Sequence, residues 1–240
     1  MKKLNTLIAL LLCIAVTQAQ RSKKVKGNGN EVTIERNTQD YDGLRVGGSF
    51  EVELIQGQEG HITLSGEDNI LEYITTEVQD EVLIIKKIDN VDLRPSRGKR
   101  VLITIPIESI DAIRLSGAGR LYSHTTLKGD DFKIRTSGSR NLKLSIEARS
   151  VIAVSSGSST IQLDGNTEAL EVTSSGSSNV RAYEMLANVV ELKASGSSNI
   201  RATANESLTS KISGSANIRY RGNPDKISNK VSGSGSVSKK

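Results

Sequence analysis

Residues 170–200 read LEVTSSGSSNVRAYEMLANVVELKASGSSNI, in which one pattern occurs twice, at 170–180 and at 190–200. In each copy, apolar and polar residues alternate before a Ser-Gly pair, as in Leu170-Glu171-Val172-Thr173. Alternation with a period of two is typical of a β-strand with one buried face. Glycine supplies the unusual backbone angles that a sharp corner requires. Each copy therefore predicts a strand, a turn and a second strand.

The Ser-Gly pair recurs through the second half of the chain, at successive spacings of 21, 19, 19, 20, 18 and 19. Its glycines are Gly117, Gly138, Gly157, Gly176, Gly196, Gly214 and Gly233. Four positions after them stand the apolar residues Leu121, Leu142, Ile161, Val180, Ile200, Ile218 and Val237. A period this short favours coils of short strands over pairs of helices. We therefore expect an all-β fold, a parallel β-solenoid with coils of about 19 residues.

Asparagine recurs in the same frame, three positions after the glycine, at Asn141, Asn179, Asn199 and Asn217. Stacked asparagines of neighbouring strands can bond to one another through their amides. The spacing therefore predicts a partial asparagine ladder beside the corners.

The solenoid domain is expected to cover residues 40–238. Its regular coils occupy residues 113–238, whereas residues 40–112 predict irregular opening coils with longer insertions, including strand-like runs at 82–86 and 101–105. Residues 20–39 are expected to be a linker, flexible in the Gly- and Asn-containing segment RSKKVKGNGN at 21–30.

Residues 1–19 have the layout of a secretory signal peptide: two lysines, an apolar run from Leu7 to Val16, and small residues before the expected cleavage site. The run is too short to span a bilayer, so no transmembrane segment is expected. Cys13 follows Leu12 rather than a small residue, which disfavours attachment of a lipid. Cleavage after Ala19 leaves no cysteine for disulfides, thiolate metal sites or catalysis.

Charge is distributed unevenly along the chain. Residues 31–112 hold 17 acidic and 8 basic residues, whereas residues 113–238 hold 10 acidic and 16 basic residues. This predicts a molecule that is electrically polar along its length. Aromatic residues make up only 3% and Trp is absent, so few rings could stack on bases, and nucleic acid is not an expected partner.

Basic residues form two outward columns in the frame of the repeat. The first column, three positions before the glycine, comprises Arg114, Arg135, Lys193, Lys211 and Lys230; the second, five positions after it, comprises Lys143, Arg181, Arg201 and Arg219. Such columns could bind an acidic polysaccharide or another anionic polymer of an envelope or host surface. The alternative is that they only keep the surface soluble and protect strand edges.

The carboxylates do not indicate an enzyme. The coils offer only scattered acids such as Asp164, Glu171 and Glu191, of which the last two share a column, whereas polysaccharide lyases and hydrolases built on β-helices need clustered carboxylates. The two histidines, His61 and His124, have no second histidine at ligand spacing. We expect neither catalysis nor a cofactor nor a metal site.

Several segments together resemble the head GIN domain family of candidate autotransporter adhesins, known mainly from exported proteins of Bacteroidetes. The segments are GLRVGGSFEVELIQG at 43–57, TTEVQDEVLIIKK at 75–87, VLITIPIESIDAIRLSGAG at 101–119 and the SGSS(N) coils that follow. The resemblance covers residues 40–236. It implies a right-handed parallel β-helix, a location in the periplasm or at the cell surface of a Gram-negative bacterium, and a role in adhesion.

Two hypotheses of function remain open. The first is an exported, non-enzymatic surface protein that binds a polymer through contacts repeated in every coil, so that weak contacts add up through geometry. The second is a periplasmic structural or envelope-stress scaffold that forms homo-oligomers through its open ends, because solenoid ends expose unpaired strand edges.

Overall fold

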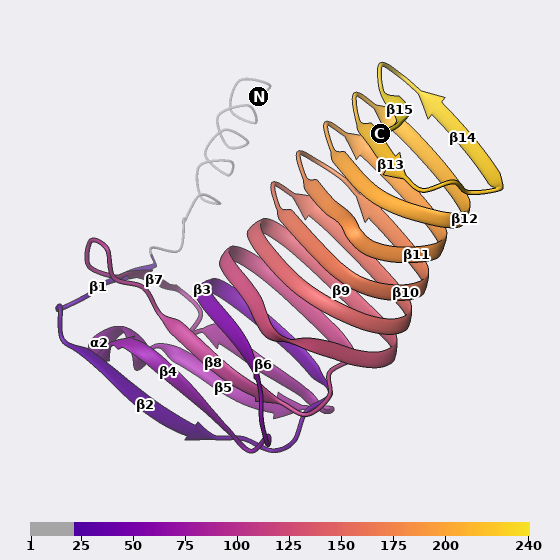
Figure 1. Ribbon diagram of the computed structural model, residues 1–240. Helices are drawn as coiled ribbons and strands as arrows, with labels where there is room; N and C mark the ends of the chain where they lie inside the picture. The colour runs from indigo at the N-terminus through magenta and orange to yellow at the C-terminus, as the bar shows by residue number, and fades with distance from the viewer. Residues whose placement is uncertain (1–21) are drawn as a thin grey trace, which may run out of the picture.

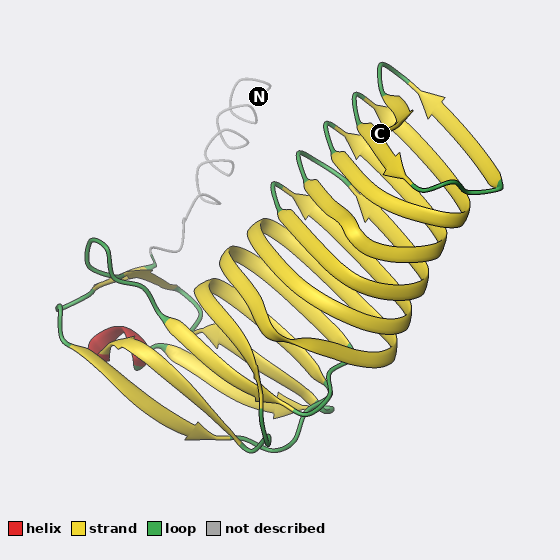
Figure 2. Cartoon of the chain, in the orientation of Figure 1, coloured by secondary structure: helices red, strands yellow, loops and turns green. Residues whose placement is uncertain are grey.

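The structure is a computed structural model and describes residues 22–240. The predicted signal peptide, residues 1–19 with Cys13, lies outside the described residues. The described part is an all-β protein with a single short helix among its elements (Figures 1 and 2). None of its helices is long and apolar enough to cross a membrane.

Eight strands and the helix make up the N-terminal part (Figure 1). They are β1 (Lys23–Lys26), β2 (Glu31–Asn37), β3 (Gly43–Gln56), β4 (His61–Glu67), α2 (Asp68–Leu71), β5 (Ile74–Gln79), β6 (Val82–Lys87), β7 (Val91–Arg94) and β8 (Leu102–Ile107). The C-terminal part consists of seven strands. They are β9 (Ala112–Gly157), β10 (Thr160–Ser174), β11 (Asn179–Gly196), β12 (Asn199–Gly214), β13 (Asn217–Arg221), β14 (Lys226–Ser232) and β15 (Ser236–Lys239).

Thirteen strands form one sheet in the order β15-β13-β12-β11-β10-β9-β3-β8-β4-β2, with β14 on β12 and β6 joining β5 to β3. From β9 to β15 the pairs between these strands are all parallel. Antiparallel pairs occur only in the N-terminal part, between β2 and β4, β4 and β8, and β5 and β6. The sheet is therefore mixed. Its C-terminal part is a stack of parallel passes, where a pass is the stretch of chain around one Ser-Gly corner (Figure 2).

The pairing of these passes follows the period of the sequence. Thr160 lies opposite both Asn141 and Asn179. Asn179 in turn lies opposite Asn199. Residues paired between different strands from β9 to β15 are thus 17 to 20 positions apart. The glycine corners coincide as well, because Gly196 lies opposite Gly214.

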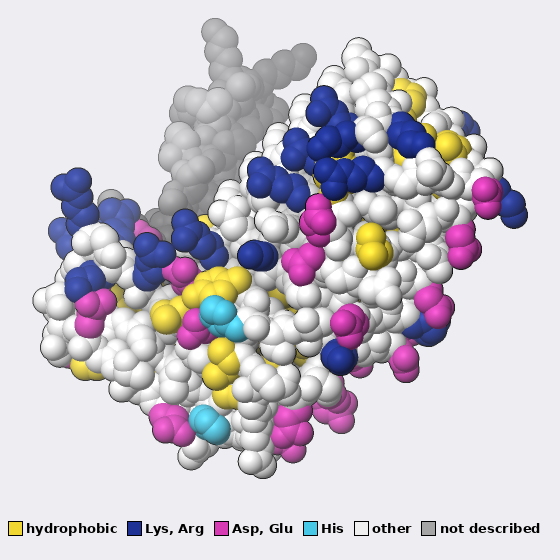
Figure 3. Space-filling view, viewed as in Figure 1, with side chains coloured by type: hydrophobic (Ala, Val, Ile, Leu, Met, Phe, Trp, Pro, Cys, Tyr) yellow, Lys and Arg dark blue, Asp and Glu magenta, His cyan; other side chains and the backbone are white. Residues whose placement is uncertain are grey.

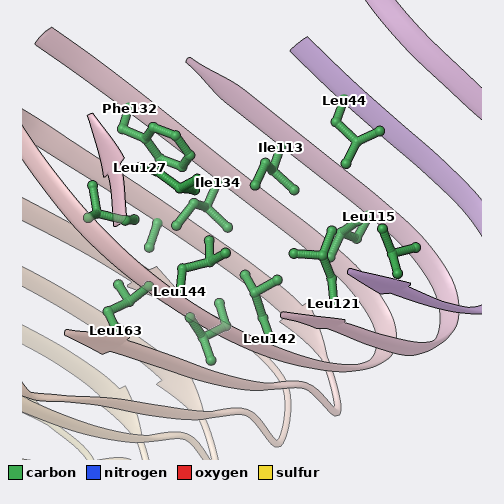
Figure 4. Close-up of a cluster of buried hydrophobic side chains, with 14 of the residues drawn as sticks. Leu44, Ile113, Leu115, Leu121, Leu127, Phe132, Ile134, Leu142, Leu144 and Leu163 are labelled. Carbon is green, nitrogen blue, oxygen red and sulfur yellow. The ribbon is translucent and has the colours of Figure 1, made fainter. Parts of the chain in front are cut away.

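The predicted inward column forms the core of the stack. Leu121, Leu142, Ile161, Val180, Ile200 and Ile218 are all buried, and only Val237, in the last pass, is half-buried. Figure 4 shows how leucine and isoleucine side chains of successive passes meet in the interior, around Leu121, Leu142 and Leu163. The alternation seen in the sequence thus predicted the buried face of these strands.

The segment expected to be a linker contains two strands. Residues 23–26 form β1, which pairs with β7, and residues 31–37 form β2, which pairs with β4. The physical reason lies in β2, where Val32 and Ile34 alternate with polar residues and pack against the core. Only the short connection around Gly27–Asn30 keeps the turn-like composition on which the linker was predicted.

The opening segment, residues 40–112, is only partly built like the later passes. β3 pairs in parallel with β9, and its Gly48 lies opposite Gly117. Residues 62–66, which resemble the repeat in sequence, instead pair antiparallel with β2 and β8. An alternating pattern fixes which face of a strand is buried but leaves its direction open.

Arg140 is buried at the corner of its pass, two positions after the glycine, where other passes carry small residues such as Ser159 and Ser178. Its guanidinium donates hydrogen bonds to the carbonyl oxygens of Gly48 at 2.7 Å and Ser116 at 2.5 Å. Burial lowers the pKa of Arg140 to about 10. Arg140 therefore joins β3 to two passes of β9.

We expect Gly176→Ala to lower the free energy of unfolding by about 3 kcal/mol or more, because it adds a steric overlap to backbone strain. Gly176 has a φ of 83°, and a Cβ there would lie 2.6 Å from the carbonyl oxygen of Gly157. Gly98, with a φ of 82° and nothing within 4 Å of such a Cβ, is the matched control. Gly98→Ala should cost about 1 kcal/mol. Denaturant unfolding followed by circular dichroism measures both, and equal losses would contradict the role of the stacked glycines.

We expect Arg140→Ser to lower the free energy of unfolding by at least about 2 kcal/mol, because it empties the corner and leaves carbonyl oxygens without their donor. Arg149→Ser is the control, since Arg149 forms an exposed ion pair with Asp131 and its loss should cost less than about 1 kcal/mol. If serine at position 140 proved as stable as arginine, Arg140 would be an ordinary corner residue like Ser159.

Candidate functional site

The second basic column lies in one unbroken register across adjacent passes. Lys143 lies opposite Gln162, and Gln162 lies opposite Arg181. Arg181 lies opposite Arg201, which lies opposite Arg219. All four basic side chains are exposed. The structure therefore brings together residues that are separated in the sequence by whole repeats.

The three arginines of this column lack anionic partners. Within residues 22–240, none of Arg181, Arg201 and Arg219 takes part in an ion pair, whereas Arg221 nearby pairs with Glu184. Neighbouring strands are separated by about 4.8 Å, so like charges on them repel by an energy on the order of 1 kcal/mol per pair before screening by salt. A bound anion would relieve that repulsion. Figure 3 shows Lys and Arg side chains gathered over the C-terminal strands on one face of the molecule.

Asparagine side chains lie beside the same column. Asn217 Nδ2 donates to Asn199 Oδ1 at 3.5 Å, and Ser236 Oγ donates to Asn217 Oδ1 at 2.8 Å. The predicted asparagine ladder thus forms between Asn199 and Asn217 and continues through the hydroxyl group of Ser236. A hollow of about 110 Å³ is lined by Asn199, Asn217, Arg201 and Arg219, so amides and guanidinium groups face the same space.

The first basic column is divided into two groups. Val154 and Thr173 occupy the equivalent positions of the passes that follow Arg135, and Thr173 lies opposite both Val154 and Lys193. Beyond this gap the column continues with Lys193, Lys211 and Lys230. The column that the sequence predicts as one stripe therefore consists of an arginine group on β9 and a lysine group on β11, β12 and β14.

Lys193 is neutralised by two carboxylates. Its Nζ lies 3.0 Å from an oxygen of Glu171 and 3.0 Å from an oxygen of Glu191, and these glutamates lie opposite each other on β10 and β11. The hydrogen bond to Glu171 contributes most to raising the pKa of Lys193. The carboxylate pair that shares a column is thus part of a surface ion-pair cluster, and Lys193 offers little free charge to a ligand.

The two histidines lie on different strands, β4 and β9. Nε2 of His124 lies 3.4 Å from Glu53, which also accepts a hydrogen bond from Thr104 at 2.6 Å. The bond from Thr104 is the main cause of the lowered pKa of Glu53. His61 begins β4 and is exposed. In the part of the chain that the structure describes, no group of three or more His, Cys, Asp or Glu residues could hold a metal ion.

Arg45 is a basic residue that the two predicted columns do not include. It lies opposite Arg114 in the pairing of β3 with β9, and its side chain is exposed. The sequence held a signal for it, because Leu44-Arg45-Val46-Gly47-Gly48 matches Ile113-Arg114-Leu115-Ser116-Gly117. Arg45 therefore extends the arginine group of the first column by one pass.

Solved structures share this fold. A protein of Bacteroides fragilis described as a "putative adhesin" is 22% identical, with a TM-score of 0.83 over 90% of this chain and 100% of that one. A "putative lipid binding protein" of Parabacteroides distasonis is 24% identical, with a TM-score of 0.74 over 91% of this chain and 100% of that one. A "putative adhesin" of Parabacteroides merdae is 21% identical, with a TM-score of 0.72 over the same shares. No match was found among the curated proteins.

The family model described as "Putative auto-transporter adhesin, head GIN domain" matches residues 40–224. This range takes in β3, β9 and the passes that carry the second basic column, and it agrees with the resemblance drawn from the sequence. The chain therefore belongs to the head GIN domain family.

Proposed function

We propose that the protein is an exported, non-enzymatic surface protein that binds an anionic polymer through its second basic column. The observation that carries this proposal is the unbroken line of Arg181, Arg201 and Arg219, exposed and without ionic partners among the described residues. Acidic polysaccharide is the polymer class that best fits an exported protein with so few aromatic side chains.

The binding mechanism is repetition. In this proposal the parallel passes are right-handed coils of one repeat each. Paired residues that are 17 to 20 positions apart support the length of one repeat per coil, and the right-handed turn is what the resemblance to the family implies. A rigid stack presents its guanidinium groups at regular spacing, so an extended polymer can contact several at once. Each exposed contact is weak and screened by salt. Linked contacts on one polymer raise the overall affinity without any new type of contact.

The proposed location rests on the family and on the N-terminal sequence. Membership of an adhesin-like family and the fold shared with proteins of Bacteroides and Parabacteroides support export to the periplasm or surface of a Gram-negative bacterium. The layout of residues 1–19 as a signal peptide supports the same conclusion.

We expect the triple variant Arg181→Glu, Arg201→Glu, Arg219→Glu to lose at least about tenfold in affinity for an acidic polysaccharide, because it replaces three attractive contacts by repulsive ones. Polygalacturonate immobilised on a biosensor, measured at low and high salt, provides the readout. The control is Lys128→Glu, Lys133→Glu, Arg149→Glu, which changes the net charge equally at three positions outside the column, all on β9. Binding that survives the first triple variant would show that the column is not the site.

Assembly through the ends of the sheet is the second candidate function. β14 exposes Ile227 and Val231, which are 48% and 44% accessible, and carries Lys226 and Lys230. At the opposite end of the sheet, β2 carries Glu31, which also pairs with Lys99, and Glu35, and the two glutamates are spaced like the two lysines. These complementary edges favour pairing of β14 with β2 of another copy. Such a head-to-tail contact leaves both ends free and can propagate.

Sedimentation velocity over a range of concentrations tests this assembly. We expect larger species as the concentration rises, and only monomer for Lys226→Glu, Lys230→Glu, because like charges would then face each other. Adding Glu31→Lys and Glu35→Lys to that variant reverses both edges and should restore assembly. A wild-type chain that stays monomeric at every concentration would count against the scaffold hypothesis.

A further inference from the structure

A second arginine cluster surrounds a groove on β3 and β9, on the strand segments that precede the glycine corners. The groove has a volume of about 410 Å³. It is lined by Arg45, Arg114 and Arg135, together with Leu115, Ser116, Thr136, Ser137, Val154 and Ser156. It is separated along the chain from the second basic column, whose residues follow the corners.

The three arginines come from three successive passes. Arg45 and Arg114 lie opposite each other in the parallel pairing of β3 and β9. The pass that carries Arg135 lies directly against the pass that carries Arg114. Ser137 Oγ donates to the carbonyl oxygen of Leu115 at 3.4 Å, and a Cβ on Gly138 would meet the backbone of Gly117. At about 4.8 Å per strand, the row of three spans about 10 Å.

The positive charge of the groove is uncompensated. No acidic residue lines it. Within residues 22–240, Arg45, Arg114 and Arg135 take part in no ion pair, whereas Arg100, Arg120 and Arg149 each pair with a carboxylate. Three guanidinium groups held side by side without an acid form a site that favours an anion with several oxygens.

The lining residues other than the arginines narrow the class of ligand that the groove could bind. Leu115 is buried, Val154 is half-buried at the position equivalent to Arg135 one pass further on, and Ser116 and Ser156 carry hydroxyl groups. A carboxylate has two oxygens and occupies one guanidinium in a bidentate pair. A phosphate or sulfate ester offers three terminal oxygens and can contact more than one arginine, while the sugar attached to it can contact the apolar and hydroxyl-bearing residues that also line the groove.

We propose that the groove at Arg45, Arg114 and Arg135 binds the phosphate or sulfate ester group of a sugar. The site is distinct from the polymer-binding column of the proposed function and does not depend on it, since the two sets of residues do not overlap. A surface glycan or a free sugar ester could supply such a group, and the chemistry that the groove recognises is the same.

Isothermal titration with glucose 6-phosphate, glucose 6-sulfate and glucuronate tests the proposal on the described chain. We expect at least one of the two esters to bind at least about tenfold more tightly than glucuronate. The ester that binds more tightly shows whether the groove prefers a phosphate or a sulfate group. Equal affinity for all three compounds, or no heat from either ester at millimolar concentration, would overturn the proposal.

Two variants identify the residues involved. Arg45→Gln, Arg114→Gln, Arg135→Gln should abolish ester binding while the circular dichroism spectrum stays unchanged, because all three side chains are exposed. Arg45→Lys alone keeps the charge but removes the fork, and should weaken ester binding several-fold. The triple Glu variant of Arg181, Arg201 and Arg219 is the control and should bind the ester like wild type. Loss of ester binding in that control, with retention in the Gln variant, would place the site on the other column instead.

Discussion

Backbone contact between stacked glycines is the constraint on which the alignment of the passes depends. At each corner, a Cβ on the glycine would lie between 2.3 and 3.0 Å from the carbonyl oxygen of the corresponding glycine of the previous pass, from Gly117 on Gly48 to Gly233 on Gly214. Both a Cβ at the glycine and the carbonyl oxygen that it would meet have positions fixed by the backbone. No change of side-chain rotamer can therefore relieve the overlap. The apolar core, the asparagines and the arginine columns all stand at fixed offsets from these corners, so their stacking follows from that of the glycines.

Differences in the length of the passes are absorbed away from the glycine corners. Register shifts occur between Gln162 and Asp164 and, in the pairing of β11 with β12, around Tyr183–Leu186 and Asn188. In this region Leu186 and Val189 are 51% and 48% exposed, unlike the apolar residues near the glycines. Bulges of this kind accept an extra residue by bending one strand locally. The spacing of the repeat can therefore vary slightly while the columns near the corners remain straight.

The sequence predicted the features that depend on the repeat and not those that depend on contacts between distant segments. The inward column was readable because Leu142, Ile161 and Val180 recur at one offset and alternate with polar neighbours. The antiparallel place of Ile62–Gly66 was not, since alternation carries no information on strand direction. Arginine is usually a surface residue, so the burial of Arg140 could not be predicted. It depends on carbonyl groups of β3 that accept its hydrogen bonds. The second basic column could be placed by counting, whereas the neutralisation of Lys193 required knowing that Glu171 lies on the neighbouring pass.

The position of Arg140 also bears on the order in which the protein folds. Most passes pair with the pass directly before them in the chain, so each new contact closes a short loop. The bond from Arg140 to Gly48 joins residues 92 positions apart, and closing so long a loop early costs more conformational entropy. The repetitive C-terminal part is thus expected to form first. At its exposed edge, Arg140 would still lack the carbonyl oxygen of Gly48 on β3 that accepts its hydrogen bond in the folded protein. The N-terminal strands, although synthesised earlier, would then fold onto that edge as their template.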